Sequence, residues 1–254
     1  MTKTPKIIWQ TWKTKNSNEI PDDLAKYSKL WKKLHPFYEY HLLDDDDLRS
    51  IVSDVVPQYL EDYDSFSYTI EKVDFARYAI LYKYGGIYAD MDTYPYKSLD
   101  TFVNLNKIVL GKEPVEHAQK IYNKKEILCN ALMISPPNEE LWLKFMDFII
   151  ENYEHNFDAV YNTGPLAMTD FFEKNPEYKK KVIITDPCIF YPLKNNGEVT
   201  ENCNLDDSYV AHVWNNSWAP TLFDNKKWKN VRYWTIILLI IYFMLWFYLF
   251  YKGI

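Results

Sequence analysis

Runs of basic residues and cysteine motifs are both missing from this sequence of 254 residues. The formal net charge is −6 at pH 7, and no cluster of lysine and arginine is long enough to suggest a nucleic-acid footprint. We therefore expect no nucleic-acid partner. Cys129, Cys188 and Cys203 are widely spaced, form no metal-binding motif and cannot all pair, so we expect no disulfide framework. Arginine is also scarce, so Arg77, which lies in the stretch from Glu71 to Pro95 discussed below, is a stronger candidate for a functional role.

The first residues lack the apolar core of a signal peptide, whereas the last ones form a long apolar run. Trp234 to Tyr251 is interrupted only by Thr235. A helix of this length would reach about 27 Å at about 1.5 Å per residue, close to the thickness of a hydrocarbon core. A buried core helix is the alternative. The run favours a transmembrane helix, because it has no polar face and carries tryptophan and tyrosine at its ends.

Charges around this run predict an orientation and a domain plan. Four basic residues, Lys226, Lys227, Lys229 and Arg232, come before it and only Lys252 follows. The positive-inside rule then places the main domain on the cytoplasmic side of a single-pass membrane protein with a C-terminal anchor, with the Golgi or endoplasmic reticulum as candidate membranes. We expect a main domain over residues 1–222, a basic and aromatic juxtamembrane linker over 223–233 and a transmembrane helix over 234–251.

Strand-like and helix-like segments alternate along the main domain, which favours an α/β fold with a mostly parallel central sheet. Hydrophobic patterns and turn residues predict the elements. Expected strands cover residues 6–11, 38–43, 87–91, 107–111, 127–134, 182–184, 189–191 and 209–214. Expected helices cover residues 21–34, 44–55, 70–84, 139–153 and 163–172, the fourth of them capped by Asn138.

The stretch from Glu71 to Pro95 concentrates the chemistry of the chain. Apolar residues recur at helical spacing from Ile70 to Tyr84, and Gly85-Gly86 then ends the helix, because glycine takes a left-handed C-cap without steric cost. A strand over Ile87–Met91 would turn Ile87, Ala89 and Met91 to one face and Tyr88, Asp90 and Asp92 to the other.

Two carboxylates on one face of a strand end suit a divalent cation, which prefers hard oxygen ligands. Asp74 and Arg77 lie three residues apart and should share a helix face beside this pair. Asp-x-Asp alone is a weak signal, because the run Asp44–Asp47 contains it twice. We interpret that run as a helix cap with a solvated face.

The context of the carboxylate pair resembles a known family. Asp74-Phe-Ala-Arg77-Tyr with Gly85-Gly86-Ile-Tyr88-Ala-Asp90-Met-Asp92 resembles the sugar-binding region of Asp-x-Asp glycosyltransferases. It is most similar to family 32, which includes the fungal initiating mannosyltransferases and the inositol-phosphoceramide mannosyltransferases. The large clostridial glucosylating toxins share the same core pattern. The resemblance covers residues 5 to about 220 in segments and leaves out Lys112–Glu126.

Four further segments resemble the family, and each also has a purely structural interpretation. Trp12 follows the opening strand, where Trp9 replaces the usual histidine, and matches a base-stacking tryptophan; it could equally be a core or edge aromatic. Asn130 matches an asparagine beside the donor, and a buried, satisfied asparagine is the alternative. Gly164-Pro165 matches a helix start near the acceptor, or is a helix start only. His212 lies in a closing His-x-Trp segment and is either a metal ligand or structural.

The resemblance implies a GT-A nucleotide-sugar transferase fold and a divalent cation, Mn²⁺ or Mg²⁺. Asp92 would ligate the cation directly, His212 would complete the shell, and Asp90 would reach the ribose or a metal-bound water. Tyr88 would contact the ribose, while Asp74 and Arg77 would bind sugar hydroxyls. We assign no catalytic base or nucleophile.

The resemblance favours transfer of mannose from GDP-mannose, with retention, to a sphingolipid head group of the inositol-phosphoceramide type. UDP-sugar donors and glycan or protein acceptors are the alternative. A tail-anchored scaffold with a decayed site is the non-enzymatic alternative, and the intact set of site residues argues against it. A metal phosphohydrolase would need more clustered acids and histidines than the five scattered histidines provide.

Overall fold

The computed structural model describes residues 2–215. Their strands are β1 (Ile7–Thr11), β2 (Glu39–Leu43), β3 (Gly86–Ala89), β4 (Thr93–Pro95), β5 (Val109–Lys112), β6 (Leu128–Ser135), β7 (Ile183–Thr185) and β8 (Val210–His212). Their helices are α1 (Asp22–Leu34), α2 (Asp45–Val55), α3 (Leu60–Ser65), α4 (Thr69–Tyr84), α5 (Asp100–Val103), α6 (Val115–Tyr122), α7 (Glu140–Asn152), α8 (Ala159–Asn162), α9 (Pro165–Lys174), α10 (Pro176–Lys179) and α11 (Pro187–Phe190). Two 3₁₀ turns, η1 (Ser17–Glu19) and η2 (Pro57–Tyr59), precede α1 and α3.

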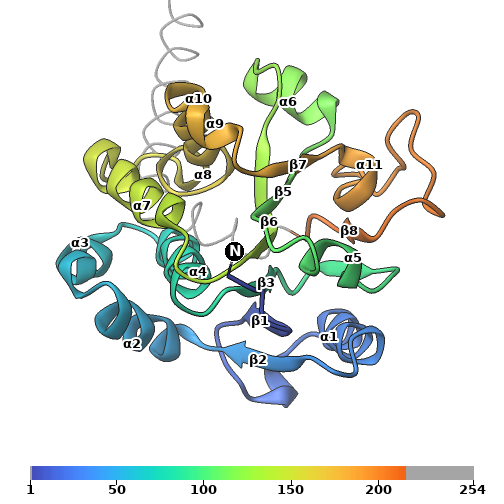
Figure 1. The fold of residues 1–254 in the computed structure, drawn as a ribbon, viewed down its shortest axis with the longest axis horizontal. Coiled ribbons are helices and arrows are strands. Elements are labelled where there is room, and N and C mark those ends of the chain that lie inside the picture. The colour runs from blue at the N-terminus through green and yellow to red at the C-terminus, as the bar shows by residue number, and fades with distance from the viewer. Residues whose placement is uncertain (1, 216–254) are drawn as a thin grey trace, which may run out of the picture. The chain divides into compact units, whose positions relative to one another are not determined.

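The central sheet confirms the predicted α/β class. Within residues 2–215 it has six strands in the order β2-β1-β3-β6-β5-β7 (Figure 1). β6 pairs antiparallel with β3 and β5, whereas the β1–β2, β1–β3 and β5–β7 pairs are parallel. Five strands therefore run the same way, and the carboxyl ends of β1, β3 and β5 meet at one edge. β4 and β8 form a separate antiparallel pair.

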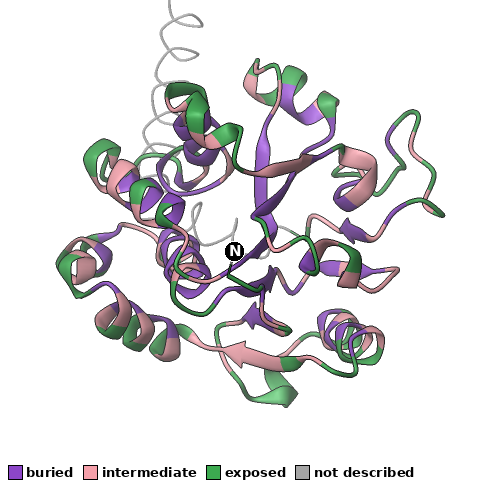
Figure 2. Ribbon diagram, viewed as in Figure 1, coloured by how far each residue is buried: buried purple, intermediate pink, exposed green. Residues whose placement is uncertain are grey.

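Helices cover both faces of this sheet, and each face has its own apolar cluster. One cluster joins α2, α3, α4, α7 and α9 to the sheet, and the other lies beneath α1, α5 and α11. Strand β3 contributes to both, because its side chains alternate: Tyr88 belongs to the first, and Ile87 and Ala89 belong to the second. The buried strands run through the middle of the molecule in Figure 2.

Helix α4 is more deeply buried than its apolar stripe predicts. Every residue from Asp74 to Leu81 is buried, although Tyr84 at its end is exposed. The helix lies between the sheet and its neighbours α2 and α7, so there is no solvent side for most of its length. Asp74 and Arg77, which an amphipathic helix would hold at the surface, are consequently inside the protein.

The Gly85-Gly86 corner ends α4 as predicted. Both residues have positive φ, 64° and 94°, and the Gly85 N–H donates to the Leu81 carbonyl. A Cβ atom on Gly85 would lie 2.7 Å from the Ser135 carbonyl oxygen, and one on Gly86 would lie 2.7 Å from the Ile7 carbonyl oxygen. Only glycine therefore fits the tight step from helix to central strand.

Three local predictions are wrong. Residues 189–191 were expected as a strand but fall at the end of α11 and just after it, because Pro187 in the first turn pre-sets helical φ and the apolar run is too short to show a period. Asn138 does not cap α7: Glu139 is the N-cap, and Asn138 adopts a left-handed turn with φ 62°. The strand expected to reach Met91 ends at Ala89, and the short strand β4 was not foreseen.

The cysteine prediction is also wrong in part. Cys188 and Cys203 form a disulfide, and Cys129 is free and buried. The two partners lie 15 residues apart in the sequence. The loop after α11 brings them together, which their spacing alone does not reveal.

Within residues 2–215, no helix is both long and apolar enough to cross a membrane. The predicted linker over 223–233 and the predicted transmembrane helix over 234–251 lie outside the described residues.

Candidate functional site

The Asp-x-Asp pair lies in a turn rather than on a strand face. After β3 the backbone reverses, and the carbonyl oxygen of Asp90 accepts hydrogen bonds from the Thr93 N–H at 3.1 Å and the Thr93 hydroxyl at 2.6 Å. The Gln10 side chain donates to the same carbonyl at 3.1 Å. The predicted alternation of side chains therefore stops at Ala89, and this turn decides where Asp92 points.

His212 lies close to the two carboxylates, and its role as a metal ligand stays a prediction. β8 pairs with β4 in a register that places His212 opposite Thr93. One ligand atom from each of Asp90, Asp92 and His212 lies within 4.8 Å of the others. His212 Nε2 is 3.1 Å from Asp92 Oδ1, and the Asn215 N–H donates to Asp92 Oδ2 at 2.9 Å.

The electrostatics of this cluster favour a cation. Burial raises the pKa of Asp90, and repulsion by Asp92 adds to that rise, although Arg77 opposes it. Burial also raises the pKa of Asp92, but attraction by His212 and the hydrogen bonds from His212 and Asn215 outweigh it and leave the pKa below its ordinary value. Burial lowers the pKa of His212, and the neighbouring Asp92 carboxylate more than reverses this. Two close carboxylates thus repel each other in a partly desolvated place.

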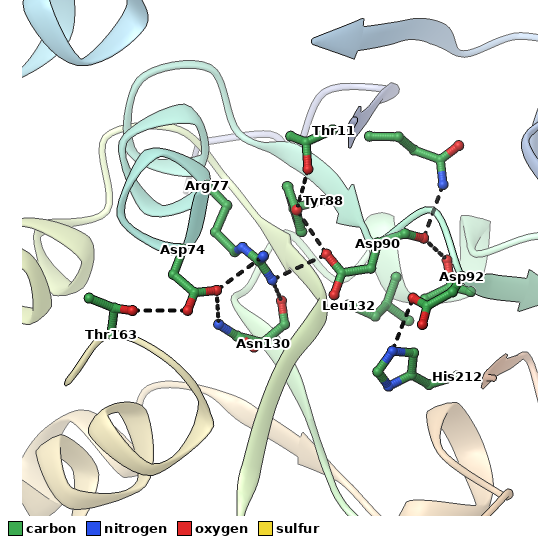
Figure 3. A network of polar contacts seen from close by, with 12 residues as sticks. Thr11, Asp74, Arg77, Tyr88, Asp90, Asp92, Asn130, Leu132, Thr163 and His212 are labelled. Atoms are coloured by element: carbon green, nitrogen blue, oxygen red, sulfur yellow. Dashed lines mark hydrogen bonds and ion pairs between the residues drawn. The ribbon is translucent and has the colours of Figure 1, made fainter. Parts of the chain in front are cut away.

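Beside this cluster lies a second polar network, centred on the predicted pair Asp74 and Arg77 (Figure 3). Arg77 Nη2 is 3.0 Å from Asp74 Oδ1, the contact expected for residues three apart on a helix. Asn130 donates to Asp74 Oδ1 at 2.9 Å, and the Thr163 hydroxyl donates to Oδ2 at 2.9 Å. Burial raises the pKa of Asp74 to about 6, although Arg77, Thr163 and Asn130 oppose the rise.

Arg77 joins the two networks. Its Nη1 lies 3.2 Å from Asp90 Oδ1 and donates to the Asn130 carbonyl at 3.0 Å. The guanidinium also stacks 4.5 Å from the centre of the Tyr88 ring. Burial would lower the pKa of Arg77, but Asp90, Tyr88 and Asp74 hold it above its ordinary value. The arginine is therefore a buried, permanently charged bridge between the two carboxylate sites.

Tyr88 fixes Asp90 from the strand. Its hydroxyl donates to Asp90 Oδ1 at 2.8 Å and lies 3.0 Å from the Thr11 hydroxyl, which completes its bonding. The Tyr88 side chain is fully buried. A contact between Tyr88 and a ribose remains a prediction. The contact that the structure shows is the hydrogen bond by which Tyr88 holds Asp90.

Three residues of the site were not predicted from the sequence: Gln10, Thr11 and Thr163. Gln10 holds the Asp90 carbonyl, Thr11 supports Tyr88, and Thr163 bonds Asp74. Gln10 and Thr11 lie within the strand predicted over residues 6–11, and Thr163 is the first residue of the helix predicted over 163–172. A motif of this kind marks the segment but does not show which neighbouring side chain turns inward.

Among residues 2–215, no hydrogen bond or ion pair links Trp12, Gly164 or Pro165 to the carboxylate networks. The indole N–H of Trp12 is buried without a hydrogen-bond partner among the described residues. Gly164 and Pro165 are the N-cap and first residue of α9, and a Cβ on Gly164 would lie 3.0 Å from Val160 Cα. The binding roles of these three residues stay predictions. The close packing against Val160 is by itself enough to explain a glycine at position 164.

The residues present fit a divalent cation. Two carboxylates and an imidazole form a donor set that suits Mn²⁺ or Mg²⁺, with the nitrogen ligand favouring Mn²⁺. Asp90, Asp92 and His212 keep 26%, 16% and 11% of their side chains exposed, so the cluster opens to the surface. The Nδ1 atom of His212 is buried without a partner among the described residues.

Comparisons with known sequences agree with this site. A family model described as the glycosyltransferase sugar-binding region containing a DXD motif matches residues 21–110. The uncharacterized glycosyltransferase L373 of Acanthamoeba polyphaga mimivirus is 31% identical over 240 residues, which cover 87% of this chain and 89% of that protein. Inositol phosphoceramide mannosyltransferase 3 of Schizosaccharomyces pombe is 47% identical over 100 residues, but the match spans only 27% of its length and 39% of this chain.

Solved structures support the fold alone, because their sequences have diverged too far. The PaToxG glycosyltransferase superposes with a TM-score of 0.50 at 18% identity, covering 70% of this chain and 72% of that one. The ligand-free glycosyltransferase domain of the YGT toxin gives a TM-score of 0.53 at 8% identity, covering 73% and 80%. The predicted GT-A-like fold is thus confirmed. With the DXD turn, the flanking aspartate–arginine pair and the full-length viral relative, the chain belongs to the DXD-containing glycosyltransferases of family 32.

Proposed function

We propose that this protein is a metal-dependent glycosyltransferase that moves a hexose from a nucleotide sugar to an acceptor at a membrane. The observation that carries the proposal is the convergence of Asp90, Asp92 and His212 beside the Asp74–Arg77 pair. Both groups lie where β3 ends, at the strand edge at which α/β sheets bind ligands. A decayed scaffold would not be expected to keep all five residues in contact.

Asp90, Asp92 and His212 would hold Mn²⁺ or Mg²⁺. The ion, when bound, would neutralise the negative charge that develops on the diphosphate leaving group. The chain's own contribution is to fix the ligands in advance. Asn215 and the His212 imidazole orient Asp92, while Tyr88 and Arg77 orient Asp90. Ligands held this way need little rearrangement when the donor arrives.

Asp74 and Arg77 would bind the hydroxyl groups of the transferred sugar. Asp74 is fixed by three donors, from Arg77, Asn130 and Thr163. The Arg77 guanidinium also forms an ion pair with Asp90. The pair therefore lies next to the proposed cation, where the sugar ring of a metal-bound nucleotide sugar would be placed. Tyr88 and Trp12 are proposed contacts to the nucleoside, and Asn130 is a further proposed contact to the donor.

We propose mannose from GDP-mannose as the donor, with retention of configuration, because several relatives are named mannosyltransferases. Among them are two S. pombe proteins named inositol phosphoceramide mannosyltransferases. Their names lead us to propose a sphingolipid head group of this type as acceptor. A UDP-sugar with a glycan or protein acceptor is the competing assignment. A panel of GDP-mannose, UDP-glucose, UDP-galactose and UDP-GlcNAc, scored by Mn²⁺-dependent hydrolysis, separates the donors.

Asp92→Asn tests the proposed metal-dependent reaction, because it keeps the side-chain shape and removes the charge that binds the ion. Hydrolysis and transfer should fall by about a thousandfold, since a catalytic cation supplies several kcal/mol of stabilisation. Asp100→Asn is the control: this carboxylate is also held by a neighbouring side chain, the Tyr38 hydroxyl, but is not part of the cluster. Near wild-type turnover in a folded Asp92→Asn protein would refute the proposal.

We also propose that the segment over 234–251 anchors the enzyme to a membrane. The basic residues before it favour a cytoplasmic domain, whereas the Cys188–Cys203 disulfide favours an oxidising compartment. Removing residues 234–254 should abolish transfer to acceptor lipid in vesicles and leave transfer to a short-chain soluble acceptor intact. Equal transfer on vesicles with and without the segment would contradict the proposal. Protease protection of the domain in sealed microsomes would show which side it faces.

A further inference from the structure

The imidazole of His212 is held by aromatic rings as well as by Asp92. The ring of Trp214 lies 4.1 Å from it, centre to centre, and the ring of Tyr191 lies 6.2 Å away at a steep angle. Tyr191 is anchored in turn by its hydroxyl, which bonds the backbone of Leu132 on the central strand β6. The direction of the histidine ring is thus set by its packing, because its only hydrogen bond among the described residues goes to Asp92.

Trp214 has an unusual backbone conformation. Its φ is 56°, in the left-handed region that bulky residues rarely adopt. Its surroundings hold it there: the indole N–H donates to the Leu193 carbonyl at 2.8 Å, and the ring meets the edge of His117 at 4.6 Å. An unfavourable backbone conformation that is held by side-chain contacts on several sides is typical of functional sites.

The contact with His117 is itself fixed. His117 Nε2 accepts a hydrogen bond from the Asn195 N–H at 3.2 Å. Nδ1 faces Glu113 Oε2 at 3.5 Å, and both side chains are buried. Leu193 and Asn195, which hold Trp214 and His117, both lie in the loop closed by the Cys188–Cys203 disulfide.

From this chain of contacts we infer that Trp214 is a positioning residue that sets the ring orientation of His212 for metal binding. The inference rests on the proposed metal role of Asp90, Asp92 and His212. A metal-ligating histidine needs a partner that fixes its ring, and loss of such outer partners typically weakens metal affinity by about 10- to 100-fold. Here the support is an aromatic ring held in place by the disulfide-closed loop.

The test measures Mn²⁺ affinity directly, by electron paramagnetic resonance of free Mn²⁺, with Mn²⁺ alone and with Mn²⁺ plus GDP. Trp214→Asn removes the ring while asparagine tolerates the positive φ. Its Mn²⁺ affinity should fall by about 10- to 100-fold. Trp214→Phe keeps a ring against His212 but loses the bond to Leu193, and it should bind Mn²⁺ within a few-fold of the wild type.

Trp9 supplies a matched control in the same fold. Its indole also packs against a histidine, His41, at 4.6 Å between ring centres and donates to a backbone carbonyl, that of Gly85. Trp9→Phe should lower the unfolding temperature of the metal-free protein about as much as Trp214→Phe, and it should leave Mn²⁺ affinity unchanged. A loss of affinity confined to position 214 identifies positioning rather than general loosening of the fold.

The outcomes separate this inference from the proposed function. If Asp92→Asn abolishes Mn²⁺ binding while Trp214→Asn binds as tightly as the wild type, the metal site stands and the role of Trp214 is refuted. If Trp9→Phe loses as much Mn²⁺ affinity as Trp214→Asn does, the role of Trp214 is refuted as well. If the wild type itself does not bind Mn²⁺, with or without GDP, the metal site fails and the inference fails with it.

Discussion

The site consists of two groups of residues, the Asp74–Arg77 network and the Asp90–Asp92–His212 cluster, and they are built in opposite ways. The Asp74–Arg77 network comes from a helix and the strand beside it, its two central side chains are only 6% and 3% exposed, and Asp74 bonds three donors. The Asp90–Asp92–His212 cluster is partly open and lies on a turn, and its histidine is 120 residues distant in the sequence. The first group is buried and held by several partners, whereas the second is partly exposed and brings two carboxylates close together.

This difference suggests a division of labour. A buried network held by several hydrogen bonds is rigid, which suits a group that must recognise a sugar by fixed hydrogen bonds. An open cluster that brings two carboxylates and an imidazole together suits an exchangeable cation. Arg77 links the two, because its guanidinium reaches both Asp74 and Asp90.

The sharpest test of the division is Asp74→Asn, which keeps the side-chain shape and removes its charge. Transfer should fall by about 10²- to 10³-fold, the range expected when one preorganised polar group of an active site is lost. Nucleoside-diphosphate affinity in Mn²⁺, measured by calorimetry, should stay nearly unchanged. If nucleotide binding falls as far as transfer does, Asp74 belongs functionally to the cation cluster and the division is wrong.

The buried network should also reveal itself through pH. The pKa of Asp74 in the folded protein, about 6, lies above its ordinary value of 3.8. The stability it contributes is therefore full below about pH 4 and is lost as the pH rises toward 6. The loss should approach about 3 kcal/mol, because one pKa unit corresponds to about 1.4 kcal/mol.

The measurement is the free energy of unfolding of the metal-free protein between pH 4 and 6.5, by urea titration. Asp74→Asn cannot titrate at this position, so its stability should fall less than that of the wild type across this range. Parallel curves for the two proteins would show that Asp74 is ionised throughout and that its burial does not govern its charge.

The cation cluster should depend on a distant covalent link. Replacing Cys188 and Cys203 together by serine should lower the free energy of unfolding by about 3 kcal/mol, the value for a closed loop of about 15 residues. It should also weaken Mn²⁺ binding several-fold, because the freed loop holds Trp214 and His117. Cys129→Ala is the control, since that thiol is unpaired. Unchanged Mn²⁺ affinity would show that the loop does not support the metal site.

The smallest effect is expected at the edge of the buried network. Thr11→Val removes the hydroxyl beside Tyr88 and leaves the bond from Tyr88 to Asp90. The free energy of unfolding should fall by about 1 kcal/mol, as for one hydrogen bond, with transfer lowered only a few-fold. Thr14→Val, at a hydroxyl that accepts only a local backbone bond, is the comparison. A thousandfold loss of transfer in Thr11→Val would mean that Tyr88 acts on the substrate directly.

Local patterns predicted much of this protein. The helix before Gly85, the positive φ of that glycine and the mostly parallel sheet follow from spacing and turn chemistry, which act over a few residues. The helix cap predicted for the run of aspartates is present, and it takes the form of a capping box in which the side chains of Asp44 and Asp47 accept from each other's backbone N–H groups. The pair Asp74 and Arg77 and the trio with His212 were each named from sequence, the trio with the help of the family resemblance.

Tertiary structure decided the rest, because it depends on contacts between segments far apart in the chain. Spacing placed Asp74 and Arg77 on one helix face, but only the packing of α4 between the sheet and α7 made that face an interior one. The turn that aims Asp92, the inward direction of Thr163 and the pairing of Cys188 with Cys203 are likewise set by neighbours distant in sequence. A sequence lists the groups that bind a sugar or a metal. Their charge, exposure and partners exist only once the chain has folded around them.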